Sequence, residues 1–189
     1  MSSPIVYRVL AGVDRDTFAE VARDLGLTAH GALKRDDDCY EVPWTDAGQT
    51  TAVNYVEDPH SDQHYISVRG RDADALLDAL DHKIELYDPE ELIEIAYAAE
   101  ERDPDELAEN LLRLAITFTE YDRTVHGIFE SYALDAPDPQ LRKAALDAIG
   151  LHAWEELRPV VQKVANEDKA PEVSAYAKGV LERWVAARD

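Results

Sequence analysis

The sequence predicts a small α+β domain followed by an all-α array of about three helical pairs. In the first half, apolar residues fall in short β-rich segments, whereas from residue 89 onward they recur at helical spacing. In addition, two segments near the C-terminus share one pattern of apolar residues after an Asp/Pro turn. The change of period divides the chain into residues 1–88 and 89–189, because Asp88-Pro89 begins a new helix.

The first half contains the elements of a small antiparallel sheet with two helices. The expected strands are residues 5–10, 39–45, 50–56 and 64–68, and the expected helices are residues 14–25 and a segment that follows Asp72. Pro43 cannot donate a ladder hydrogen bond, so we expect its strand at an edge of the sheet. The order β-α-β-β-β-α is typical of a sheet with both helices packed on one face.

Two aromatic residues of this half are expected at the surface. Trp44 and Tyr55 lie in weakly patterned β segments with polar neighbours. The aromatic residues of the second half occur at helical spacing, and we expect most of them to pack in the core.

Asp-Pro dipeptides mark helix starts in the second half. Proline fits the first helical position because its ring fixes φ where no N–H is needed, and a preceding Asp can accept hydrogen bonds from the free amides. The expected pairs are residues 90–102 with 104–116, 123–134 with 139–149, and 154–165 with 171–184. Gly150 is expected to cap the helix that ends at Ile149.

The last two pairs share their apolar pattern. Pro139, Leu141, Ala145, Ala148 and Ile149 align with Pro171, Val173, Ala177, Val180 and Leu181. A helical pair of this kind cannot cover its own apolar face, so pairs stack on one another and form a solenoid surface suited to binding macromolecules.

The segment from Asp135 to Gly150, followed by Leu157 to Val161 and Pro171 to Ala177, resembles the HEAT repeat family. The resemblance is best over residues 135–184, is weaker over 89–118, and does not extend to the N-terminal half. It implies a right-handed superhelix of antiparallel helix pairs whose second helices line a concave face. An irregular bundle of six helices is the alternative.

The resemblance also implies a ladder of ion pairs between repeats, formed by an Asp in each turn and an Arg in each second helix. Asp135, Asp168 and Arg142 stand at such positions. Ala108 and Ser174 stand at the other Arg positions, so we expect the ladder to be incomplete.

The chain is strongly acidic, with 40 Asp and Glu against 19 Lys and Arg, which gives a formal net charge of −21. This field repels nucleic-acid backbones and anionic membranes and accelerates encounter with basic proteins. We therefore expect no direct nucleic-acid binding. The carboxylates are spread over both halves, which favours adaptation to high salt over a single basic partner, although both interpretations stay open.

Three features of the sequence are typical of a cytoplasmic protein. No apolar run approaches the length of about 18 residues needed to span a bilayer. The N-terminal residues lack the pattern of a signal peptide. The single cysteine, Cys39, permits no intramolecular disulfide.

Candidate catalytic chemistry is confined to one segment. His60, Asp62 and His64 alternate near the tip of an expected hairpin and could bind a metal, although a polar hairpin tip explains the same residues. The triplet Asp36 to Asp38 lacks the spacing of a calcium loop, and no phosphate loop or nucleophile elbow is present. We expect a non-enzymatic protein without a cofactor; an enzyme with a metal or polar site near His60 and His64 is the alternative.

The expected function is protein binding through the concave face of the helical array, by a prokaryotic adaptor or immunity-type inhibitor with a possibly basic partner. A salt-adapted structural scaffold is a further alternative. Glu106 and Glu109 share one helical face, where they could engage a cation. The residues expected along the concave face are Glu106, Glu109, Asn110, Arg113, Gln140, Lys143, Asp147, Lys178 and Glu182.

Overall fold

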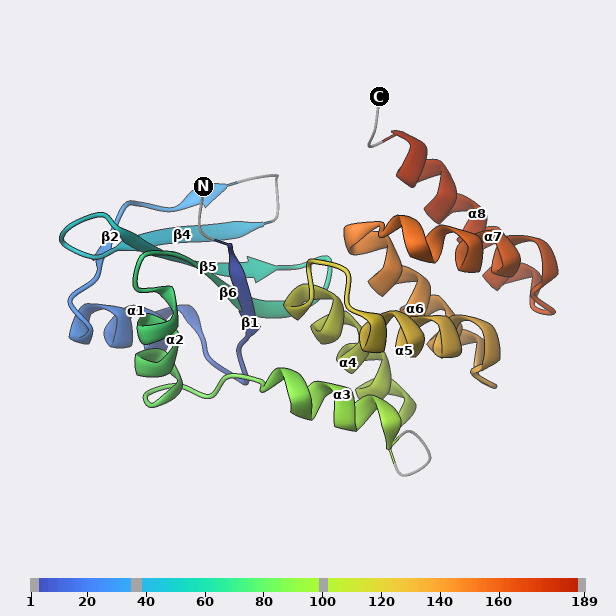
Figure 1. The fold of residues 1–189 in the computed structure, drawn as a ribbon, viewed down its shortest axis with the longest axis horizontal. Coiled ribbons are helices and arrows are strands. Elements are labelled where there is room, and N and C mark those ends of the chain that lie inside the picture. Colours follow the sequence, from blue (N-terminus) through green and yellow to red (C-terminus); the bar gives the residue numbers. More distant parts are fainter. Residues whose placement is uncertain (1–3, 35–38, 99–101, 187–189) are drawn as a thin grey trace. The chain divides into compact units, whose positions relative to one another are not determined.

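The computed structural model describes residues 4–34, 39–98 and 102–186 of the 189-residue chain. It contains two compact units, Met1–Asp88 and Pro89–Asp189, and their boundary falls where the hydrophobic period changes in the sequence. The first unit is an antiparallel sheet with two helices, and the second unit is helical (Figure 1). The triplet Asp36 to Asp38 lies outside the described residues.

The sheet of the first unit has the strand order β1-β6-β5-β4-β2, with β3 also paired to β4, and every pairing is antiparallel. The strands are β1 (Val6–Val9), β2 (Thr28–Ala29), β3 (Leu33–Lys34), β4 (Tyr40–Thr45), β5 (Thr51–Asp58) and β6 (Gln63–Gly70). The helices are α1 (Arg15–Asp24) and α2 (Ala73–Asp81). The predicted α+β class is confirmed, but β2 and β3 were not expected, because a strand of two residues carries no alternation.

Strand β4 does not lie at an edge of the sheet, so the expectation based on Pro43 is wrong. It pairs with β5 on one side and with β2 and β3 on the other. The Pro43 carbonyl accepts a hydrogen bond from the His30 amide at 2.9 Å. Because the N–H and C=O of one residue point to the same side of a strand, the missing N–H faces the interval between β2 and β3. The proline therefore interrupts no ladder.

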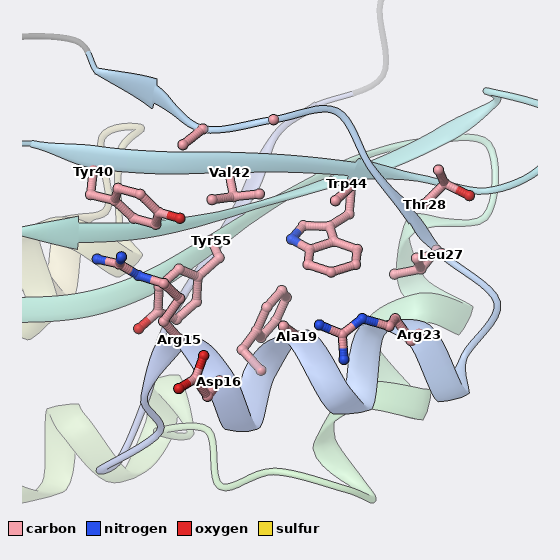
Figure 2. A pocket seen from close by; sticks show the side chains of 14 residues that line it. Arg15, Asp16, Ala19, Arg23, Leu27, Thr28, Tyr40, Val42, Trp44 and Tyr55 are labelled. Atoms are coloured by element: carbon pink, nitrogen blue, oxygen red, sulfur yellow. The ribbon is translucent and has the colours of Figure 1, made fainter.

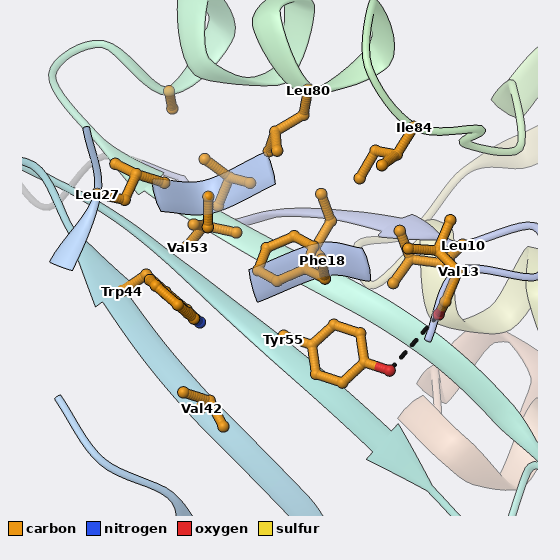
Figure 3. Packing of buried hydrophobic residues seen from close by; sticks show 14 residues of the cluster. Leu10, Val13, Phe18, Leu27, Val42, Trp44, Val53, Tyr55, Leu80 and Ile84 are labelled. Atoms are coloured by element: carbon orange, nitrogen blue, oxygen red, sulfur yellow. Dashed lines mark hydrogen bonds between the residues drawn. The ribbon is translucent and has the colours of Figure 1, made fainter. Parts of the chain in front are cut away.

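Both helices of this unit contribute to one core on one face of the sheet (Figure 3). Phe18 of α1 and Leu80 of α2 pack against alternate residues of the strands. The buried members of this core are Leu10, Val13, Phe18, Ala22, Leu27, Val42, Trp44, Val53, Tyr55, Ile66, Val68, Ala73, Leu80 and Ile84.

Trp44 and Tyr55 belong to this core, and the expectation that they are exposed is wrong. Trp44 is 5% exposed and Tyr55 is 1% exposed. The Phe18 ring packs against both, with centroid distances of 6.3 Å to Trp44 and 5.1 Å to Tyr55. Their sequence neighbours point to the opposite face of the sheet, because side chains alternate along a strand. Polar neighbours therefore say little about the burial of these two rings.

The helices of the second unit pack in successive pairs, α3 on α4, α5 on α6 and α7 on α8. The second members of the pairs also pack on one another, α4 on α6 and α6 on α8, as do α3 with α5 and α5 with α7. The helices are α3 (Pro89–Tyr97), α4 (Pro104–Thr117), α5 (Arg123–Asp135), α6 (Pro139–His152), α7 (Arg158–Glu167) and α8 (Pro171–Ala186), with a short 3₁₀ turn, η2 (Glu155–Leu157), before α7.

The Asp-Pro starts of α4 and α6 form as the sequence predicts. The Asp103 side chain accepts a hydrogen bond from the Asp105 amide at 2.8 Å, and that of Asp138 accepts one from the Gln140 amide at 2.8 Å. The proline that follows each aspartate lies in the first turn, where no N–H partner is needed.

Two helix ends differ from the predictions. Helix α6 continues beyond Gly150 to His152, and Ala153 caps it in the left-handed conformation, with φ 49° and ψ 48°. Gly150 instead faces α8, where a Cβ would contact Val180 at 3.7 Å. Helix α3 ends at Tyr97, short of the expected end at residue 102; residues 99–101 lie outside the described part of the chain.

Ala145 of α6 and Ala177 of α8, which occupy equivalent positions in the sequence pattern, are both fully buried. We expect Ala145→Leu to lower the free energy of unfolding by about 1 to 3 kcal/mol, because the added carbons overpack a close helix contact. Ala175→Leu is the matched control, since Ala175 is exposed on α8. Urea unfolding at neutral pH measures both variants, and equal stabilities would contradict the prediction.

Candidate functional site

A buried ion pair joins α6 to the turn between α7 and α8. Arg142 Nε donates to Asp168 Oδ2 at 2.8 Å, and Arg142 Nη2 donates to Oδ1 at 3.0 Å. The two side chains are 11% and 6% exposed. Arg142 Nη1 also donates to the carbonyls of Ala136 and Pro137, at 2.7 and 3.2 Å. The guanidinium thus connects the turn before α6 to the turn before α8.

The two partners shift each other's ionisation. The hydrogen bonds from Arg142 lower the pKa of Asp168, and the amide of Ala170 adds to this effect. The same contact raises the pKa of Arg142. In the preceding pair Ala108 stands at the Arg position and Asp135 is exposed, so the described residues form one such link rather than a ladder.

The nine residues predicted to line a concave face do not form one exposed row. Glu109, Gln140, Lys178 and Glu182 are exposed, whereas Glu106, Arg113, Lys143 and Asp147 are half-buried. Asn110 is fully buried, so its placement on that face is wrong. It lies three residues after Leu107 and one before Leu111, within the apolar stripe of α4, and its Nδ2 donates to the Leu92 carbonyl at 2.9 Å. Its polar character was misleading, because one hydrogen bond allows an amide to lie at a buried helix contact.

Three of the four carboxylates of this row are already engaged within the unit. Glu106 accepts a hydrogen bond from Arg102 at 2.9 Å, and Glu109 pairs with Arg113 one turn further along α4. Asp147 accepts a hydrogen bond from the Tyr176 hydroxyl, and burial raises the pKa of Asp147. The row combines four carboxylates with three cations, so it lacks the strong acidity of the chain as a whole.

A groove of 780 Å³ lies where the first helical pair meets the second. Its lining comes from the end of α3, the start of α4, α5 and the turn before α6. The apolar side chains of this groove belong to Ala96, Tyr97, Leu107, Ile128, Tyr132 and Leu141, among others. It differs from the predicted concave row, which lies on the second helices of the pairs.

Two features of the groove are unusual for a structural surface. Tyr97 is 69% exposed at its rim. Gly127 lies inside α5, where glycine destabilises a helix by about 1 kcal/mol relative to alanine. A Cβ at this position would meet no described atom within 4 Å, so packing against the described residues does not require glycine. The only signal in the sequence was an isolated glycine within a helical pattern, which had no assigned role.

The structure also places the histidines of the possible metal site. Asp58 organises the β5–β6 turn by accepting hydrogen bonds from the His60 amide and the Ser61 hydroxyl, both at 2.9 Å. His64 Nδ1 lies 3.2 Å from the Val13 carbonyl and 3.2 Å from the Tyr55 hydroxyl, so the ring is held within the core contact rather than at the turn. Within residues 4–34, 39–98 and 102–186, no group of three or more His, Cys, Asp or Glu side chains could hold a metal ion.

Comparison with known proteins finds no family whose model matches the chain, and no match among curated proteins or among solved structures. The resemblance to HEAT repeats therefore stays a prediction. In the part of the chain that the structure describes, no helix combines the length and the apolar composition needed to cross a bilayer.

The ion pair predicts a loss of stability in acid. The folded state lowers the pKa of Asp168 below the ordinary carboxyl value of about 4. The ion pair therefore contributes fully to the free energy of unfolding above that ordinary value, and its contribution is lost as the pH falls through the lowered pKa. We expect Asp168→Asn to cost about 3 kcal/mol at pH 7, because Arg142 stays buried without its counter-charge, and to cost much less at the acidic end. Urea unfolding from pH 7 downward measures this difference.

Asp135→Asn provides the control for this prediction. It removes the same charge from the turn before α6, where the side chain is exposed. It should change the unfolding free energy by about 0.5 kcal/mol or less. If Asp168→Asn lowers the free energy of unfolding no more than Asp135→Asn does, the ion pair contributes little to stability. The same conclusion follows if the cost of Asp168→Asn does not shrink as the pH falls.

Proposed function

We propose that the helical unit is a protein-binding module that holds an apolar segment of a partner in the groove between α3 and α5. The observation that carries the proposal is Gly127, a helix-interior glycine that faces open space in this groove. Since no contact with a described residue requires glycine at this position, a second chain that approaches the helix backbone there would account for it. Tyr97 then supplies an aromatic contact, of the kind that dominates binding interfaces.

The proposed architecture of this unit is a HEAT-like solenoid of three helical pairs. Three observations support it: the continuous packing of α4, α6 and α8, the equivalent burial of Ala145 and Ala177, and the ion pair between Arg142 and Asp168. In such an array each pair covers the apolar face of the next. The groove lies on the side of the first helices, where α3 and α5 meet.

The charges of the groove favour a basic partner. Asp135 and Asp138 line it and form no ion pair with a described residue. Arg102 also lines it, but Glu106 compensates its charge. A partner segment with an apolar anchor and an adjacent Lys or Arg fits both the lining and the rim. An adaptor or immunity-type inhibitor would act here by occupying a basic surface of its target.

Substitutions of Gly127 test this function. Leucine at this position should extend into the groove and abolish binding, whereas Gly127→Ala should leave the groove open and raise the free energy of unfolding by about 0.5 to 1 kcal/mol. The probes are peptides selected from a random library on the full chain, with affinities measured by titration for the wild type and both variants. The proposal expects selected peptides to combine an apolar anchor with Lys or Arg.

Two results would contradict this function. One is a set of selected peptides without that chemistry. The other is a set of peptides that bind the Gly127→Leu protein as tightly as the wild type. Thermal unfolding of the leucine variant, which adds its side chain in open space, verifies that it is folded.

The salt-adapted scaffold is tested separately by the response of the melting temperature to sodium chloride. Raising the salt from about 0.1 M to about 1 M shortens the screening length from about 10 Å to about 3 Å. With a net charge of −21 spread over both halves, we expect the melting temperature to rise by several degrees, because repulsion among carboxylates weakens. An unchanged melting temperature would reject adaptation of the whole surface to salt.

A further inference from the structure

A separate cavity of 520 Å³ lies in the N-terminal unit, between α1 and β4 (Figure 2). Its walls are largely apolar and include Phe18, Ala19, Val42, Trp44 and Tyr55. Four of these residues belong to the core described above, and exposed residues such as Arg23 and Ala29 form the rim, so the cavity is an open depression whose floor is the core. Cavities of about 300 to 1,000 Å³ with apolar walls and a few polar groups are typical sites for small organic ligands.

One buried donor in this cavity has no acceptor. Trp44 is 5% exposed, and its Nε1 has no hydrogen-bond partner among the described residues. Its nitrogen points into the space between the Trp44 and Tyr55 rings, in both close views (Figures 2 and 3). A buried polar atom is normally satisfied, so this indole N–H indicates a position for an acceptor atom of a bound molecule.

Helix α1 contributes two cations to the same cavity. Arg15 and Arg23 lie eight residues apart, with Ala19 midway, so the three side chains share one side of the helix. Both cations line the cavity, and among the described residues that line it the one carboxylate is Asp16, which neighbours Arg15. A positively charged lining contrasts with the net charge of −21 of the chain.

The two arginines are not equivalent. Arg15 is held by Glu57, with Nε 3.2 Å from Oε1, and its guanidinium carbon lies 3.4 Å from the centre of the Tyr40 ring. The contact with Glu57 also raises the pKa of Arg15. Arg23 is exposed and forms no ion pair with a described residue, so its charge is available to a ligand. The available cation is thus the one on the Trp44 side of the cavity (Figure 2).

We propose that this cavity binds a small amphipathic organic carboxylate. Its apolar body lies against Phe18, Val42 and Tyr55. Its carboxylate faces Arg23, and one of the two carboxylate oxygens accepts the hydrogen bond of the Trp44 indole. The ligand is oriented with its carboxylate toward Arg23, because Asp16 at the other end of the cavity would repel an anion placed there. This site is independent of the groove in the helical unit and does not rest on the proposed function.

The test uses the full chain and 2-naphthoate as the probe, followed by nuclear magnetic resonance of the indole N–H groups. Trp44→Phe identifies the Trp44 signal. We expect naphthoate to shift that signal and to slow its exchange with water, while the signals of Trp154 and Trp184, in the helical unit, stay in place. The cation 2-naphthylmethylammonium has a similar apolar body and should bind at least tenfold more weakly.

Variants separate charge recognition from simple apolar binding. Arg23→Gln should weaken naphthoate binding about tenfold, which corresponds to about 1.4 kcal/mol. Arg71→Gln removes the same charge from an exposed position that does not line the cavity, and it should bind like the wild type. Ala19→Leu should fill the cavity and abolish binding.

Each of three results would overturn the proposal: no shift of the Trp44 signal at millimolar naphthoate, equal binding of the ammonium probe, or unchanged affinity in Arg23→Gln. Should Ala19→Leu fail to fold, as judged by circular dichroism, Arg23→Gln still decides the question, because Arg23 is exposed and makes no ion pair with a described residue. A shift of the Trp44 signal that depends on both the carboxylate and Arg23 supports the site.

Discussion

Each amphipathic element of this protein needs a second element to cover its apolar face, and both units are arranged around that constraint. In the N-terminal unit, α1 and α2 cover one face of the sheet, and Phe18 lies at the centre of the contact. In the helical unit, α6 is covered on two sides, by α4 and by α8. Small residues such as Ala145 permit the close approach, because larger side chains would separate the backbones.

Hydrogen bonds between polar groups at these contacts fix which parts of the helices are neighbours. Arg142 reaches Asp168 and two backbone carbonyls, and the hydroxyl of Tyr132 donates to the Ala96 carbonyl at 2.8 Å. The Arg142–Asp168 ion pair and the Tyr132 hydrogen bond each link one helical pair to the next, whereas the two carbonyls hold Arg142 against the turn of its own pair. A buried group that loses its partner destabilises the fold by more than an ordinary contact contributes, so such bonds specify which helices are neighbours. Apolar packing alone would tolerate sliding of one helix along another.

Several of the carboxylates that give the chain its negative net charge are paired with cations, so the negative charge differs from one surface to another. Carboxylates on α4 pair with arginines of their own segment, and the row once expected to attract a basic partner is nearly balanced. Unpaired carboxylates instead lie at the groove between α3 and α5. In the cavity of the N-terminal unit the available charge is instead a cation, Arg23, since Glu57 compensates Arg15. The two proposed sites therefore select ligands of opposite charge, although one net charge describes the whole chain.

Local regularities of the sequence predict much of the secondary structure. The change of hydrophobic period marks the boundary near Asp88, and Asp103 and Asp138 mark helix starts, because a cap depends only on residues two or three positions away. Several elements were beyond the reach of such local signals. Strands β2 and β3 form only because β4 offers them a partner, and Gly150 lies inside α6, facing α8, rather than at the helix end.

The sites depend almost entirely on tertiary structure. Asn110 has a polar side chain and Trp44 has polar neighbours in the sequence, and both features suggest exposure, yet long-range packing buries both residues. The groove brings Tyr97, Gly127 and Leu141 together from three helices, and the cavity opposes α1 to β4. The sequence by itself determined the two units, most of their helices and longer strands, and the overall charge, since these follow from period and composition. Only the tertiary structure decided which faces are covered and where open space remains, because burial depends on partners that are distant in the chain.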